Sequence, residues 1–506
     1  MERKERSKLQ KSLNPSSVWA VAVGSIIGWG CFIQAANWTE RAGGPLPLCL
    51  GFLAGGLLMV VVGLSYSYMI AKFPVAGGEF AYAYKAFGRR VAYICGWMLS
   101  LGYVSIVALN ATALPVLASY IFPGVLDFGY LYTIAGYDVY AGEALFSCSL
   151  IVIFGIMNYR GVKSVGKLQF TMVLIMIAAV VISVCGTVFT GSFQYESLQP
   201  LYGEGKSFFS GFISIVALAP FLFVGFDCIP QAAEEYDFPA KKAKFLLISS
   251  ITVGAFIYVM MAVVTDGVLP WQEVTSLVDE TTGTIVKWHT GAILDLAMGR
   301  LGVGFVAVAV TMGIFTGLNG FFMTSSRLLF GMARAKMLPD AFAKVHPKYQ
   351  TPNICVVFTL LVCCICPFFG REVITWVVDM CSVGTAFGYF FTCACAYILV
   401  KHVGDPTDEN KISPFVALAG SLISVGILLL LIVPGSPAFM SIQSFIALGG
   451  WIVLGLVFYL VSVKSFSKVT KREMDYLILG NVQVTRGMRK NQYAHERVEA
   501  EIVLDK

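Results

Sequence analysis

The sequence predicts an all-α integral membrane protein with twelve transmembrane helices, and three observations support this fold class. The chain of 506 residues is 57% hydrophobic and only 13% charged, whereas ordinary soluble domains carry about 25% charged residues. The apolar residues come in blocks of about 20, the length of helix that crosses a bilayer. The connectors between the blocks are alternately rich and poor in Lys and Arg, as expected when they alternate between two membrane faces.

The predicted spans follow one another along most of the chain. In chain order they cover about residues 18–38, 47–71, 91–121, 140–158, 166–190, 208–233, 244–265, 301–330, 354–369, 373–400, 412–433 and 441–463. With the N-terminus placed in the cytoplasm, the cytoplasmic segments carry 31 Lys and Arg and the outer segments carry 5. Because basic connectors stay in the cytoplasm, we expect a multi-pass protein of the plasma or inner membrane with both termini cytoplasmic. The net charge of +6 reflects this loop bias, so membrane lipid is an expected partner and nucleic acid is not.

The first span is interrupted by glycine. Its segment Gly24–Gly30 holds three glycines in seven residues, and each glycine inside a helix costs about 0.5–1 kcal/mol relative to alanine. In a bilayer, irregular backbone is tolerated where it lines a cavity buried in protein. The segment is therefore either a broken helix whose freed backbone groups hold a ligand, or a close packing surface made by the small residues Gly24 and Gly28.

The sixth span carries a similar interruption. Pro220, Gly225, Asp227 and Pro230 fall within eleven residues, and a carboxylate facing lipid there would cost at least about 2.5–3.5 kcal/mol. Gly225 follows Gly28 by five spans, an odd number, so the second half would be inserted upside down relative to the first. Matching breaks in inverted halves point to a transporter's substrate site near the membrane midplane, which favours the ligand interpretation of the first break.

These features predict how the chain is divided. We expect a cytoplasmic N-terminus over residues 1–17, a first inverted repeat over 18–200, a second over 201–400, two more spans over 401–464 and a cytoplasmic tail over 465–506. Residues 80–84 are expected to form an amphipathic helix on the membrane surface, and the long loop 266–300 to hold short helices. The charged tail is expected to be partly disordered.

Catalytic and metal-binding patterns are missing from the sequence. The 13 cysteines are scattered and mostly lie inside apolar spans, where they act as small packing residues. The four histidines lie far apart in predicted loops, and there is no phosphate-binding G-x-x-x-x-G-K-[ST] motif. We therefore expect no catalytic residues, no metal site, no enzyme activity and no cofactor.

Four motifs resemble those of the amino acid–polyamine–organocation (APC) transporters. They are Gly24–Phe32 in the first span, Pro74–Phe80 after the second, Phe221–Asp227 with Ala232–Glu235 in the sixth, and Ser326–Arg334 with Leu338-Pro339 at the end of the eighth. They occur in family order over about residues 15–400. The resemblance implies a LeuT-type fold, in which helices 1–5 and 6–10 are inverted repeats, helices 1 and 6 are broken, and helices 11 and 12 are peripheral.

The resemblance also implies a binding site for an amino acid. Its candidate residues lie in the two breaks and in span 8: Ile26, Ile27, Gly28, Trp29, Gly30, Phe221, Leu222, Val224, Gly225, Asn319 and Phe321. The substrate carboxylate would meet backbone N–H groups at the first break, where a half-helix begins and its dipole is positive. The ammonium would meet carbonyl groups at the second break. Phe221 would close over the substrate as an aromatic gate, or it is an ordinary core aromatic.

Three positions depart from the family pattern or leave alternatives open. Trp29 stands where many members have a small residue, so it lines the pocket or packs away from it. Met176 stands where proton-coupled members carry a lysine in helix 5. Asp227 could titrate, bridge to a neighbouring helix or cap the broken backbone.

Charged residues at the cytoplasmic end of span 6 suggest a gate. Glu234 and Glu235 either pair with basic inner residues or form a solvated helix end, and Arg327 is their partner or an anchor to lipid headgroups. The predicted function is secondary active transport of an amino acid or related amine by alternating access. The alternatives are an exchanger of such solutes and a membrane sensor of the same fold. The coupling ion, sodium or a proton, and the oligomeric state stay open, and a monomer fits these features.

Overall fold

The computed structural model describes residues 9–134, 137–203, 207–278, 286, 288–369, 373–403, 411–436 and 438–480. Parts of the predicted N-terminus and tail, residues 1–8 and 481–506, lie outside the described residues.

The first half of the chain forms helices and one short hairpin. Its elements are α1 (Pro15–Ile27), α2 (Gly30–Ile33), α3 (Ala35–Ala42), α4 (Pro45–Lys72), α5 (Gly78–Phe87), α6 (Arg89–Ile121), β1 (Tyr130–Ile134), β2 (Tyr137–Tyr140), α7 (Ala141–Arg160) and α8 (Val162–Phe189). The two strands pair antiparallel. This hairpin is absent from the all-α prediction, because its exposed residues lie in a loop between apolar spans.

The second half is helical in its described part. Its helices are α9 (Phe208–Val216), α10 (Ala219–Phe223), α11 (Cys228–Gln231), α12 (Ala243–Asp266), α13 (Trp271–Val274), α14 (His289–Met298), α15 (Arg300–Arg334), α16 (Asn353–Cys363), α17 (Val373–Val403), α18 (Pro414–Ile432), α19 (Ile442–Phe466) and α20 (Lys471–Leu479). Short 3-10 turns join several of them.

Ten helical segments within the described ranges are long and apolar enough to cross a membrane. They agree with ten of the predicted spans to within a few residues. The predicted span 208–233 is divided among α9, α10 and α11, and the span 354–369 consists of α16 and a 3-10 turn over Cys366–Phe369. Neither of these two predicted spans contains one continuous helix that is long enough to be counted as membrane-spanning.

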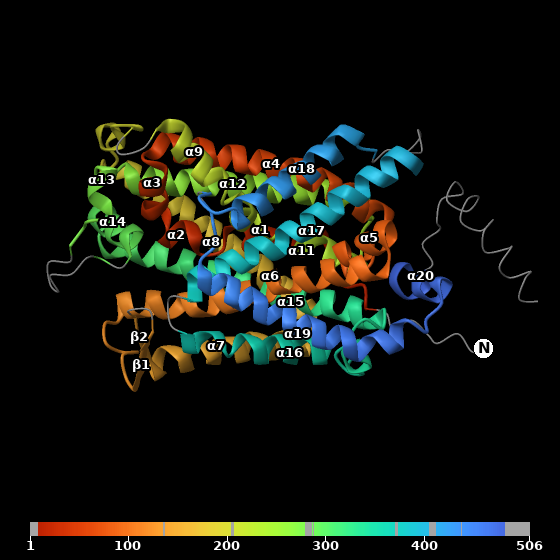
Figure 1. Ribbon diagram of the computed structural model, residues 1–506. Coiled ribbons are helices and arrows are strands. Elements are labelled where there is room, and N and C mark those ends of the chain that lie inside the picture. The colour runs from red at the N-terminus through yellow and green to blue at the C-terminus, as the bar shows by residue number, and fades with distance from the viewer. Residues whose placement is uncertain are drawn as a thin grey trace, which may run out of the picture.

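The long helices run side by side, and the bundle has two distinct ends (Figure 1). We call the end that carries α5 and α20 the N-terminal end. The opposite end carries α3, α13, α14 and the β1–β2 hairpin. Connectors predicted to share the cytoplasmic side do meet: Lys11, Arg160, Glu235 and Lys348 line one pocket.

Both predicted interruptions are present as breaks in the helices. α1 ends at Ile27 and α2 begins at Gly30, with Gly28 between them at φ 50° and ψ −140°. α10 ends at Phe223 and α11 begins at Cys228, with Gly225 at φ 133°. Residues with a Cβ rarely adopt such positive φ values, so glycine is required at both positions.

Helix α5 is buried, whereas a helix on the membrane surface was predicted for these residues. Residues Gly78–Tyr84 are all buried, and the helix packs against α6 and α17. The prediction of a surface helix was wrong because small and aromatic residues cover every side of it, and these fit a contact between helices. The short helices expected in loop 266–300 are confirmed as α13 and α14. The start of the tail forms α20, which is tied to α5 by a 2.8 Å hydrogen bond from Tyr84 to Asp475.

Substitution of the two break glycines should lower stability to different degrees. A Cβ on Gly28 would have its nearest neighbour 4.0 Å away, so Gly28→Ala suffers from backbone strain alone, about 1–3 kcal/mol. A Cβ on Gly225 would lie 2.6 Å from the backbone N of Ile26. Gly225→Ala should therefore lower the melting temperature of the purified protein further than Gly28→Ala. Gly304→Ala, on α15 with open space around it, is the control, and equal melting temperatures for all three variants would contradict this account.

Candidate functional site

The two broken helices meet backbone to backbone. Gly225 lies so close to the last turn of α1 that a Cβ on it would be 2.7 Å from the Cβ of Ser25. From α12, Gly254 approaches Ile26 in the same way, at 2.4 Å from its Cγ2. The sequence-predicted residues of the first and second breaks are therefore brought together, although about 200 residues separate them in the chain.

One hydroxyl group connects the two breaks. Tyr258 on α12 donates to the carbonyl O of Ile26 and to that of Leu222, the latter at 2.6 Å. Its ring is held by Phe52 and Phe223, with centroid separations of 5.4 and 5.7 Å. Because a hydroxyl has a single proton, it can satisfy only one of the two carbonyl groups at a time. Sequence reasoning missed Tyr258, since one tyrosine in an apolar span carries no local signal.

Helix α15 supports the first break from the other side. A Cβ on Gly313 would fall 1.9 Å from the carbonyl O of Gly28, so only glycine allows this approach. One turn later, the Thr316 hydroxyl donates to the carbonyl O of Gly24 at 3.2 Å. These contacts fix the end of α1 against α15.

A buried amide network continues from this contact. Gln169 on α8 donates through Nε2 to the carbonyl O of Thr316 at 3.1 Å, and its Oε1 accepts from Asn319 at 2.7 Å. Asn319 in turn accepts from Asn158 on α7 at 3.0 Å. The amide of Asn319 is thus directed toward α7 and α8. Gln169, and not Met176, is the residue of the fifth span whose polar group reaches α15.

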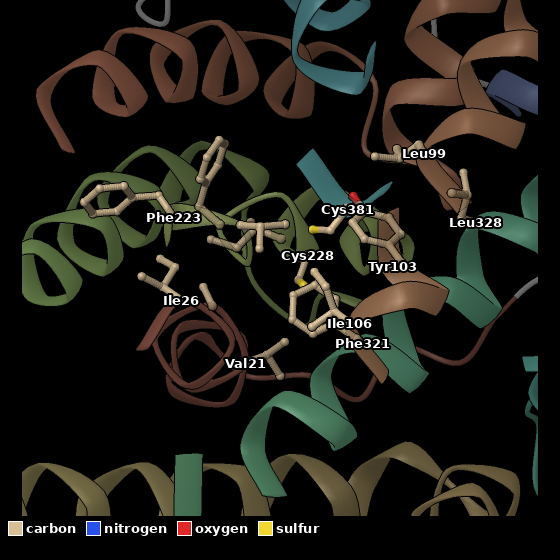
Figure 2. Close-up of a cluster of buried hydrophobic side chains, with 14 of the residues drawn as sticks. Val21, Ile26, Leu99, Tyr103, Ile106, Phe223, Cys228, Phe321, Leu328 and Cys381 are labelled. Atoms are coloured by element: carbon tan, nitrogen blue, oxygen red, sulfur yellow. The ribbon is translucent and has the colours of Figure 1, made fainter. Parts of the chain in front are cut away.

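The other candidate residues are distributed around the breaks. Phe321 is fully buried with its ring 6.0 Å from that of Tyr103, and Figure 2 shows both beside Cys228 of α11. Trp29 is 6% exposed and belongs to the continuous hydrophobic core. The remaining candidates are Ile27, Leu222 and Val224, which are buried, and Gly30 and Phe221, which are partly buried.

Asp227 bridges its own break. The carboxylate is fully buried, and its Oδ1 accepts from the backbone N–H of Gly225 at 2.7 Å. Its Oδ2 has no hydrogen-bond partner among the described residues. The capping contact, one of the three roles considered for Asp227, is present in this conformation.

Two ion pairs tie the end of the sixth span to α15. Arg327 donates to Glu235 through Nε at 2.7 Å, and both side chains are almost completely buried. Arg334 binds both oxygens of Glu234 at 2.9 Å, and the same carboxylate accepts from the backbone N–H of Ala76 at 3.1 Å. The predicted pairing of the two glutamates with basic residues is therefore present.

Loss of the buried pair should cost far more stability than loss of an exposed one. Arg327→Leu leaves the Glu235 carboxylate buried without its partner, which we expect to destabilise the protein by about 3–5 kcal/mol. Lys336→Ala removes an exposed pair with Asp340 in the same region and should cost about 0–1 kcal/mol. Thermal unfolding of both variants in detergent measures the difference, and an equal effect would contradict the assignment of Arg327 as the partner of a buried charge.

Comparison with known proteins points to a family of membrane transporters. The family model described as "Amino acid permease" matches residues 13–458. The chain is 24% identical to the branched-chain amino acid permease BcaP of Bacillus subtilis (strain 168), over 92% of this chain and 95% of that protein. It is 26% identical to the methylthioribose transporter of the same organism with the same coverage, and 26% identical to its aspartate-proton symporter over 76% of this chain and 72% of that protein.

A family match over nearly the whole chain, together with a multi-pass helical bundle broken at two matched glycines, leads to one conclusion. The chain belongs to the amino acid permease family of the APC superfamily, a family of membrane transporters.

Proposed function

We propose that this protein is a secondary active transporter that moves an amino acid or a related amine across the plasma or inner membrane by alternating access. The observation that carries this proposal is the meeting of the two breaks at Tyr258. Backbone carbonyl groups of Ile26 and Leu222 converge on one hydroxyl, which leaves one acceptor for another donor. An ammonium group has three donors and suits such a position.

The opposite charge of an amino acid would be bound at the start of α2. There the backbone N–H groups of Trp29 and Gly30 lie at the beginning of a half-helix, which favours a carboxylate. The N–H of Gly28 already donates to the carbonyl O of Gly24 at 3.0 Å. Phe221 would cover the bound molecule, and the buried ring of Trp29 would limit its size. The close contact between the two breaks, at Gly225 and the last turn of α1, supports these roles.

We further propose that all twelve predicted spans cross the membrane in a LeuT-type arrangement, with the N-terminal end in the cytoplasm. The strong excess of Lys and Arg in the connectors of that end supports the orientation. In this arrangement the pairs Arg327–Glu235 and Arg334–Glu234 close the cytoplasmic side. They would have to separate for substrate to leave in that direction.

A ligand screen tests the proposed function. Purified protein is heated with single amino acids, with amines and with methylthioribose, in the presence and absence of sodium. A true ligand raises the apparent stability by mass action, by about 2.7 kcal/mol at 100 times its Kd. Ligands that raise the melting temperature are then followed as radiolabelled solutes into vesicles containing the protein. If no amino acid or amine shifts the melting temperature or enters the vesicles, the proposed substrate class is wrong.

Removal of the hydroxyl that joins the breaks should weaken binding. Tyr258→Phe keeps the ring packing but removes the hydroxyl that holds the carbonyl groups of Ile26 and Leu222 together. Because the two acceptors then lose their fixed positions, we expect the Kd of the best ligand to rise about tenfold, equivalent to about 1.4 kcal/mol. Tyr93→Phe removes an equally short bond, from a tyrosine to the carbonyl O of Gly455, at the contact between α6 and α19. This control should leave the Kd unchanged. Equal Kd values for Tyr258→Phe and the unmodified protein would contradict the placement of the site.

A further inference from the structure

Glu79 is a buried carboxylate that the sequence analysis did not single out. It lies in the first turn of α5 and is 0% exposed. The preceding Gly78 has no Cβ, and one placed there would lie 3.1 Å from the Cβ of Pro230 and 3.2 Å from Nε2 of Gln231. The start of α5 therefore lies directly on α11. Gln231 uses this contact to donate to Oε2 of Glu79 at 2.5 Å.

The second oxygen of Glu79 shares a hydroxyl group with the break of the sixth span. The Tyr103 hydroxyl is 3.3 Å from Oε1 of Glu79 and also 3.3 Å from the backbone carbonyl O of Asp227. Bonds of this type are usually about 2.7–2.8 Å long, so neither contact is tight. Since the hydroxyl has one proton to donate, it serves one acceptor or the other. Tyr103 thus lies midway between a carboxylate and the broken backbone.

The titratable groups around Glu79 are one carboxylate and several hydroxyl and thiol groups. The titratable side chains that face it come from α4, α5, α6, the second break, α11 and α17: Tyr66, Tyr82, Cys95, Tyr103, Asp227, Cys228 and Tyr389. The arginines of α15, Arg327 and Arg334, are engaged by Glu235 and Glu234, and Lys85 of α5 lies near Asp475.

Burial, and secondly the negative charge of Asp227, raise the pKa of the Glu79 carboxyl well above its ordinary range. A carboxyl with a raised pKa keeps its proton at higher pH than a free one, and it ionises as the pH rises or as water enters.

We propose that Glu79 takes up a proton from water at the N-terminal end and releases it there. The Tyr103 hydroxyl then moves its hydrogen bond between Glu79 and the carbonyl O of Asp227, in the break of the sixth span. Glu79 would be the proton-binding group of the transporter. The link between this proton and solute movement rests on the proposed function, whereas the titration of Glu79 does not depend on it.

Protonation of Glu79 involves the transfer of one proton and the rearrangement of one hydrogen bond. When Glu79 is ionised, the Tyr103 hydroxyl donates to Oε1, and the carbonyl of Asp227 loses that donor. A proton from hydronium then forms an O–H bond at Oε1, and water is left behind. The new O–H donates to the Tyr103 oxygen, so the Tyr103 proton turns to the carbonyl of Asp227. In this scheme Gln231 keeps the bond that it donates to Oε2 in the structure.

Infrared difference spectroscopy tests this proposal without a substrate. Spectra of the purified full-length protein at about pH 5 and about pH 9 should differ by a protonated-carboxyl C=O band that Glu79→Gln removes. Tyr103→Phe should keep this band but move it to higher wavenumber, because the carboxyl loses its hydrogen-bond acceptor. Tyr82 is a buried tyrosine that lies on α5 with Glu79, and its hydroxyl has no partner among the described residues. As a control, Tyr82→Phe should leave the band in place.

Two results would overturn the proposal. Identical difference spectra for the unmodified protein and Glu79→Gln would show that Glu79 does not exchange a proton in this range. If size-exclusion chromatography shows that Glu79→Gln does not fold, the Tyr103→Phe spectrum is the test. A carboxyl band at the same wavenumber in Tyr103→Phe and in the unmodified protein would exclude a hydrogen bond between Glu79 and Tyr103.

A transport measurement separates this proposal from the proposed function. Vesicles that contain the protein and a pH-sensitive dye receive a mixture of L-amino acids, and Glu79→Gln should reduce proton entry about tenfold while radiolabelled amino acid still exchanges. Equal proton entry in both proteins would refute the coupling role of Glu79. If the unmodified protein moves no amino acid, the proposed function fails, and the infrared result still decides whether Glu79 titrates.

Discussion

The structure depends on a contact between two pieces of broken backbone. Gly225 lies against the last turn of α1 at a distance that excludes even a Cβ. The neighbouring helices continue this close packing, because a Cβ on Gly320 would lie 2.3 Å from Oγ of Ser25 and one on Gly313 would strike the carbonyl O of Gly28. The main contribution of these glycines is that they have no side chain. They allow three helices to present backbone groups to one small region, where a side chain would otherwise separate them.

Three of the buried carboxylates are stabilised in different ways, and each way suggests a different role. Glu235 has an arginine partner with little exposure to water, an arrangement that is costly to separate. Asp227 accepts from the N–H group of its own break and so holds an irregular backbone in shape. Glu79 has neutral donors, among them Gln231 and Tyr103. A carboxyl with neutral donors can lose or gain a proton without leaving a partner charge buried, which suits a group that changes state.

The two ends of the bundle are held by different kinds of interaction. At the N-terminal end, ion pairs from α15 hold the segment that follows α11. At the opposite end, Trp288 donates to the carbonyl O of Phe32 at 2.8 Å, and Thr39 donates to Asp266 at 2.8 Å. The buried ion pairs at the N-terminal end are costly to separate unless water reaches the separated charges and hydrates them. Such a difference between the ends supports the proposed mechanism of alternating access.

The sequence by itself determined the helical membrane class, the approximate limits of ten long helices and the position of both breaks. It could do so because bilayer thickness sets the length of a span, and the cost of glycine and proline inside a helix is local. The four motifs also pointed to the correct family.

Only the tertiary structure showed that Tyr258, Gln169 and Glu79 make contacts between helices, and that α5 is buried. The physical reason is that a helix in this bundle is apolar on the side facing lipid and on the side facing protein. No periodic pattern therefore tells which way each span is turned, and the partner of a lone polar side chain is decided by the packing of the helices against one another.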